Sequence, residues 1–187
     1  MSAMGDLTGR GTRDWVGLVH VSSPADKVGG IHVVVFLQQP DDHYLVSAQT
    51  AGQLFNCGTG SCSINAIRVA RKSVFVTWNW QWRGCSDEVT FQFKQKGSHW
   101  PLIGVVGRSM EGPYGTDEND NLREGPVHTM VVDHNRVTGD VIVTQRVDKR
   151  AARVTKLKIA SPVQELGGFD GFDVPGGKGI PAICAPG

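Results

Sequence analysis

Three tryptophans stand two residues apart in the middle of the chain, at Trp78, Trp80 and Trp82. Side chains at alternate positions of a β-strand point to one face, so this spacing predicts three indoles on a single sheet surface. If buried, such a surface is a core or a subunit interface; if exposed, it is a platform on which sugar rings or bases stack. The intervening positions are polar, which favours an inward orientation and makes the ligand platform the alternative.

A basic segment lies near the end of the chain, with five positive charges within ten residues: Lys149, Arg150, Arg153, Lys156 and Lys158. If these charges converge on one surface, they would contact the phosphates of RNA. No aromatic residues are interleaved with them, as they would be in a site for single-stranded nucleic acid. The second interpretation is a solvated edge strand, whose lysines prevent unwanted strand pairing.

An acidic loop carries oxygen-bearing side chains at alternate positions, Asp117, Asn119 and Asn121, like the first ligands of a calcium loop. The EF-hand pattern requires glycine where Leu122 stands and glutamate where His128 stands, so that family is excluded. A looser calcium loop and a plain acidic surface loop are the two remaining interpretations. No other cofactor is predicted.

Catalytic machinery is not recognisable in the sequence. The six histidines show no metal-ligand spacing, no serine or cysteine stands in a G-x-S-x-G context, and no glycine loop continues into the Lys-Ser/Thr of a phosphate-binding helix. The run at 58–63 superficially resembles a protease nucleophile turn, but too little chain precedes it to supply the histidine and aspartate. We therefore do not predict an enzyme.

The four cysteines, Cys57, Cys62, Cys85 and Cys184, would form two disulfides in an oxidising compartment or remain reduced thiols. A zinc site would require a second closely spaced Cys/His pair, which Cys85 and Cys184 lack. The first residues have no basic and apolar segments of a secretory signal, and no apolar run is long enough for a membrane helix.

The elements that position these residues follow from a period-two alternation of apolar and polar residues, which predicts β-strands. Two hairpins are the clearest, one over 74–94 and one over 127–147, with Thr138-Gly139-Asp140 as the turn of the second. The segment 149–159 fits either a last strand or a short helix. The other predicted strands cover residues 15–21, 31–38, 44–49, 63–69 and 102–106.

A chain of 187 residues, 40% hydrophobic and 20% charged, fits one globular domain, and its formal net charge of +1 provides no general attraction to polyanions. Many short strands without a long helical pattern predict an all-β, antiparallel β-sandwich, jelly roll or barrel. We place an N-terminal tail at 1–13, the β-sandwich domain at 14–161, and a Gly/Pro-rich C-terminal tail at 162–187.

Residues 27–33 (KVGGIHV) resemble the start of an early strand in the jelly-roll coat proteins of picorna-like viruses, especially the small coat subunits of plant viruses related to the comoviruses. The order of short strands, polar loops and Gly/Pro-rich tails is similar too. The resemblance implies a jelly roll that assembles with copies of itself or related coat subunits, located in the virion or host cytoplasm and without an active site. The basic N-terminal arm of many coat proteins is missing, so 149–158 would be the RNA contact instead.

The leading prediction is therefore a structural assembly protein, a capsid subunit that self-associates into a shell. The alternative is a carbohydrate-binding or other ligand-binding β-sandwich that uses the tryptophan stripe or the loop at 117–121.

Overall fold

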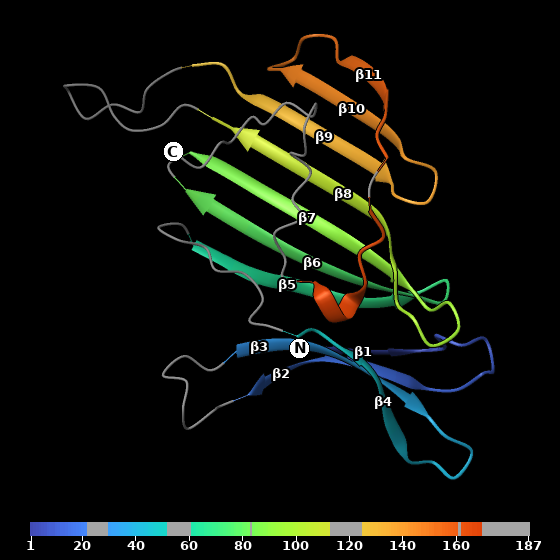
Figure 1. Ribbon diagram of the computed structural model, residues 1–187. Helices are drawn as coiled ribbons and strands as arrows, with labels where there is room; N and C mark the ends of the chain where they lie inside the picture. Colours follow the sequence, from blue (N-terminus) through green and yellow to red (C-terminus); the bar gives the residue numbers. More distant parts are fainter. Residues whose placement is uncertain (22–29, 52–60, 83, 113–124, 161, 170–187) are drawn as a thin grey trace.

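The computed structural model describes residues 1–21, 30–51, 61–82, 84–112, 125–160 and 162–169 (Figure 1). Within these ranges the chain forms two antiparallel β-sheets and one short 3₁₀ helix, η1 (Leu166–Gly168). No helix in these ranges has the length and apolarity needed to cross a bilayer.

The small sheet has four strands in the order of the sequence. Its central strands are rich in valine, which favours extended backbone. The strands are β1 (Ser2–Gly5), β2 (Asp14–Val21), β3 (Gly30–Gln38) and β4 (Tyr44–Gln49).

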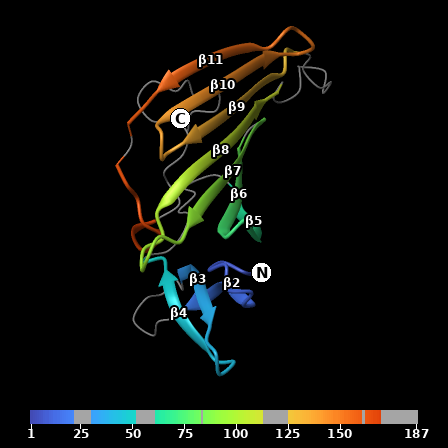
Figure 2. The same ribbon diagram turned by 90° about the vertical axis from the view of Figure 1, so that its right-hand side faces the viewer.

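The large sheet has seven strands, again in sequence order from one edge to the other. It is strongly curved, as Figure 2 shows. The strands are β5 (Ser61–Ala70), β6 (Ser73–Trp82), β7 (Cys85–Lys94), β8 (Leu102–Glu111), β9 (His128–Asn135), β10 (Asp140–Val147) and β11 (Arg153–Lys158).

Tight turns join neighbouring strands of the large sheet. Between β5 and β6, Arg71 and Lys72 have φ angles of 52° and 58°, the left-handed values that a two-residue hairpin turn requires. Between β9 and β10, the Oδ1 of Asn135 accepts hydrogen bonds from the backbone N–H groups of Val137 and Thr138, and Gly139 has a φ of 77°. This second turn is the one that the sequence predicted.

The main core lies between the small sheet and strands β5 to β8 of the large sheet. Trp100 and η1 close one side of it, and the ring of Phe169 meets Phe91 and Phe93 with centroid distances of 4.7 and 5.1 Å. Strands β9 to β11 extend beyond the small sheet and have a separate apolar cluster, Met130, Val132, Val141 and Val143. The large sheet therefore has an inner face that carries both clusters and an outer face opposite.

The predicted all-β, antiparallel two-sheet fold is confirmed, and the segment 149–159 contains a strand, β11, rather than a helix. The predicted tails differ from the structure at two points. Ser2–Gly5 pairs with β2 as strand β1, and Leu166 and Phe169 belong to the core. The remainder of the predicted C-terminal tail, 170–187, lies outside the described residues.

The jelly-roll topology was wrong. A jelly roll is built from Greek keys, in which the chain passes repeatedly between its two sheets. Here the chain completes the small sheet before it begins the large one, and both sheets are meanders. Tight turns such as those at Arg71-Lys72 and Gly139 join a strand only to its immediate neighbour, and the longer connection from Glu111 to His128 also leads to the adjacent strand.

Candidate functional site

The tryptophan stripe lies on the inner face of β6. Trp78 is 7% exposed and belongs to the main core, and the half-buried Trp80 packs against that core. Trp82 is the last residue of β6, and its side chain is outside the described part of the structure. The two described indoles therefore serve the core, which is the inward orientation that the polar intervening residues favoured.

A half-buried carboxyl group stands beside this stripe. Asp87 lies directly opposite Trp80 on β7, and Ser109 lies opposite Asp87 on β8. Burial raises the pKa of Asp87, and a side-chain hydrogen bond from Ser109 lowers it by less. The Oδ1 of Asp87 is buried and has no hydrogen-bond partner among the described residues. This carboxyl is thus held in an environment that favours its neutral form.

The basic segment does not form a single surface. Lys156 and Lys158 project from the outer face of β11, whereas Arg153 occupies the alternate, inner face. Lys158 forms a 2.8 Å ion pair with Asp140, while Lys149 and Arg150 precede the strand in the turn after β10. Strand β11 is an edge of the large sheet, as the solvated-edge interpretation predicted.

The calcium candidates Asp117, Asn119 and Asn121 lie outside the described residues. Within the described ranges no group of three or more His, Cys, Asp or Glu side chains is placed to hold a metal ion. Cys85 is disulfide-bonded. Thiol oxidation at this position is typical of proteins that meet an oxidising compartment.

The most distinctive surface of the molecule is the outer face of the small sheet, the side turned away from the core. Four apolar residues form one row across all four strands: Met4 pairs with Trp15, Trp15 with Phe36, and Phe36 with Val46. Met4 is 54% exposed and Val46 is 55% exposed. The rings of Trp15 and Phe36 are 5.0 Å apart, between these two exposed ends. Large apolar groups in a continuous exposed row mark an interaction site.

This outer face is charged at one edge, where the guanidinium of Arg13, the residue before β2, lies 3.8 Å from the Sδ of Met4. Its described strand positions carry no Asp, Glu, Lys or Arg. They are Ser2, Met4, Trp15, Gly17, Val19, His32, Val34, Phe36, Gln38, Tyr44, Val46 and Gln49. Aromatic residues and methionine without charge are the composition of an interface core, not of a surface kept in water.

The position of Trp15 depends on a glycine. Gly17 follows it on the same face, and a Cβ added at Gly17 would collide with the ring carbons Cη2 and Cζ2 of Trp15. The indole therefore occupies the space that a side chain at residue 17 would take. Val34, the neighbour of Gly17 in the register, is buried although it points outward. Trp15 is thus fixed across the centre of the face.

A buried carboxylate holds the start of β2 in place. Asp14 is fully buried, and its carboxylate accepts hydrogen bonds from the N–H of Leu7 at 2.8 Å and the N–H of Gln38 at 3.1 Å. The Oγ of Thr12 donates a third, at 3.1 Å. These bonds connect the loop after β1 to β2 and β3, and they keep the charge of Asp14 off the outer face.

This surface was not predicted from the sequence, although the sequence contains a signal for it. The stretch 33–37 (VVVFL) is apolar at every position rather than at alternate ones. Continuous apolar runs are typical of strands that are covered on both faces. In the structure the core covers only one face of β3, so its apolar run indicates that another surface covers the other face.

Compared with known protein families, curated proteins and solved structures, the chain matches none.

Proposed function

We propose that this chain is a structural assembly protein whose copies associate through the outer face of the small sheet. The observation that carries the proposal is the apolar row of Met4, Trp15, Phe36 and Val46, which is exposed at both ends and half-buried in the middle. Burial of this row removes apolar area from water, which is the main driving force of protein association.

A second copy of the chain is the occupant that this face fits. A highly charged partner would gain little here, because the described strand positions of this face carry no charge and the guanidinium of Arg13 reaches only its edge. Two identical faces related by a two-fold axis place apolar rows against one another, and a self-complementary patch is the usual form of a dimer interface. The small sheet of each copy would then be covered on both faces, as the apolar run of β3 requires.

The size of the face sets the expected strength. Four strands about 4.8 Å apart, the longest of them the nine residues of β3 at about 3.3 Å each, give roughly 500 Å² per copy. A pair would bury about 1,000 Å², which is at the lower end of specific interfaces. We therefore expect a dimer with a dissociation constant in the micromolar range.

This proposal does not depend on the resemblance to viral coat proteins, because neither sheet has jelly-roll order. A two-fold interface closes after two copies, so a shell would require further contacts between dimers. The dispersed charges of the basic segment give no reason to include RNA.

Sedimentation velocity from about 1 to about 200 μM, a range that brackets micromolar affinity, tests the proposal. We expect the wild-type chain to shift from monomer to dimer. Met4→Glu and Val46→Glu place a charge in the interface at already exposed positions, so each weakens association at least about ten-fold without unfolding the chain.

The matched control is Ile142→Glu, which adds the same charge to an exposed apolar position, 42% exposed, on the outer face of the large sheet. It should dimerise like the wild type. A wild-type chain that stays monomeric throughout this range refutes the proposal. So does a series in which Ile142→Glu prevents association and Val46→Glu does not.

A further inference from the structure

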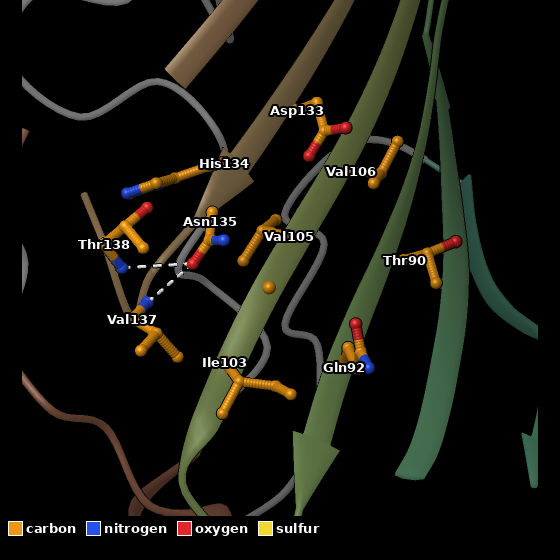
Figure 3. Close-up of a pocket in the computed structure, with 11 residues that line it drawn as sticks. Thr90, Gln92, Ile103, Val105, Val106, Asp133, His134, Asn135, Val137 and Thr138 are labelled. Atoms are coloured by element: carbon orange, nitrogen blue, oxygen red, sulfur yellow. Dashed lines mark hydrogen bonds between the residues drawn. The ribbon is translucent and has the colours of Figure 1, made fainter. Parts of the chain in front are cut away.

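A groove of about 410 Å³, lined by both apolar and polar residues, crosses strands β7, β8 and β9 on the outer face of the large sheet (Figure 3). Its floor is Gly104, near the start of β8. In the register Gln92 stands on one side of Gly104 and Asn135 on the other. The next row holds Val106, with Asp133 beside it. Because glycine has no side chain, the surface is indented at Gly104 between Gln92 and Asn135, and this indentation is the notch.

Neither the backbone nor the packing requires glycine at residue 104. Its φ angle lies outside the left-handed region, and an added Cβ would meet only the Oε1 of Gln92 at 3.3 Å, its Cβ at 3.8 Å and the carbonyl oxygen of His134 at 3.9 Å. Glycine weakens the interior of a strand, and it is often found where a ligand approaches the backbone closely. A β-bulge at Gln92 and Phe93 adjoins the notch, another feature common beside binding sites.

The polar groups around the notch are held in position but keep bonding capacity. The Nε2 of Gln92 donates to Ser73 at 3.1 Å, which leaves its Oε1 directed toward Gly104. The Oδ1 of Asn135 accepts the two turn N–H groups, which leaves its Nδ2 as a donor (Figure 3). The carboxylate of Asp133 has no hydrogen bond or ion pair with any described residue. Preorganised groups of this kind bind a ligand at low entropic cost.

The lining decides the chemical class of the ligand. The groove has no lysine or arginine among its described lining residues. His134 lines it, but strand alternation points the His134 side chain to the inner face, where it is 6% exposed. A phosphate, sulfate or carboxylate would therefore meet the carboxylate of Asp133 without a cation beside it, and a flat base would find no ring to stack on in the groove. Two acceptors and one amide donor around a narrow notch match adjacent hydroxyl groups, which donate and accept at once.

We propose that the groove over Gly104 binds a neutral saccharide, with Asp133 and Gln92 accepting hydrogen bonds from adjacent hydroxyls and Asn135 donating one. The site is on the opposite sheet from the proposed dimer face and is independent of it. It differs from the platform predicted on the tryptophan stripe, because the described indoles of that stripe belong to the core. Without an aromatic surface, we expect a dissociation constant in the millimolar range.

The test is an amide-detected NMR titration of the whole chain with neutral hexoses, pentoses and their disaccharides. We expect saturable shifts for the backbone N–H of Gly104 and the side-chain amides of Gln92 and Asn135. Gly104→Val fills the notch and should abolish the shifts, and Asp133→Asn should weaken binding about ten-fold. Gly104→Ala, which adds only a tolerated Cβ, keeps the fold and should weaken binding to an intermediate degree.

Glu88→Gln is the matched control, because it removes one negative charge from the same outer face, outside the groove. It should bind like the wild type. The proposal is overturned if no neutral saccharide gives saturable shifts at the groove, if Gly104→Val and Asp133→Asn bind like the wild type, or if an anionic sugar binds more tightly than its neutral counterpart.

Discussion

The outer faces of the two sheets differ in the charged side chains that they expose. The large sheet displays charged pairs there, Arg108 with Glu88 at 3.3 Å and Lys158 with Asp140 at 2.8 Å, beside a hydroxyl pair of Thr77 and Thr90 at 2.8 Å. Its exposed apolar residues, such as Val131 and Ile142, are interspersed with these groups. The small sheet displays a continuous apolar row and no charged residue at the described strand positions of this face. The outer face of the large sheet is therefore suited to contact with water, and the outer face of the small sheet is suited to burial against a partner.

The largest expected effect is the loss of stability on removal of the buried carboxylate of Asp14 in the small sheet, compared with removal of the exposed carboxylate of Asp140 in the large sheet. Asp14→Ala leaves three donors without their acceptor in a buried site, so we expect a loss of about 3 kcal/mol or more in the free energy of unfolding. Asp140→Ala removes an exposed ion pair with Lys158 and an exposed hydrogen bond from Thr138, and it should change stability much less. Urea unfolding of both variants measures the difference. Equal losses would mean that Asp14 does not organise the small sheet.

A smaller difference in stability is expected between alanine substitutions at Gly17, on the outer face of the small sheet, and at Gly104, on the outer face of the large sheet. Gly17→Ala forces the Trp15 ring to move, which should cost about 1–3 kcal/mol and weaken dimerisation. Gly104→Ala meets the flexible side chain of Gln92, whose Oε1 lies 3.3 Å from the added Cβ and can move, so the variant should stay within about 1 kcal/mol of the wild type. Urea unfolding gives both values, and the indole N–H resonance of Trp15 reports its displacement. If Gly17→Ala leaves that resonance unchanged, the indole does not fill the space over residue 17.

The smallest effect concerns the carboxyl on the inner face of the large sheet. The pKa of Asp87 is raised in the folded state, so folding is disfavoured as pH rises from the ordinary aspartate range through that raised value. Asp87→Asn removes this cost. The variant should therefore be more stable than the wild type at pH 7, and the gain should disappear at about pH 4 and below.

Asp140→Asn is the control of opposite sign. Hydrogen bonds from Lys158 and Thr138 lower the pKa of Asp140, so its charge stabilises the folded state above the ordinary aspartate range and ceases to do so in acid. This variant should be slightly less stable than the wild type at pH 7, with a difference that shrinks as pH falls. Two variants that shift in the same direction at pH 7 would contradict the assignment for Asp87.

Much of the fold could be predicted from the sequence, because alternation and turn residues are local signals. The hairpin of β9 and β10 and its turn at Gly139 are examples. Strand β1 was missed because its sequence, SAMG, has no β-branched residue and is extended only through its pairing with β2. The meander order was missed because turn signals show which strands are neighbours and not how two sheets divide the chain.

The candidate surfaces were harder to predict, because they depend on register. The row from Met4 to Val46 joins residues from four strands, and the groove joins Gln92, Gly104 and Asn135 from three. The apolar run at 33–37 was the one local signal for the first surface. Gly104 can be recognised as the floor of a groove only from the register, which places Gln92 and Asn135 on either side of it.

The most direct test of the account is an isotope-filtered NOE experiment on a mixture of labelled and unlabelled chain at dimer-forming concentration. It detects contacts between copies only. The account predicts contacts from the methyl groups of Met4 and Val46 to the rings of Trp15 and Phe36 of the other copy. Contacts between copies that arise instead from Val131, Ile142 or Val154 on the large sheet would contradict it.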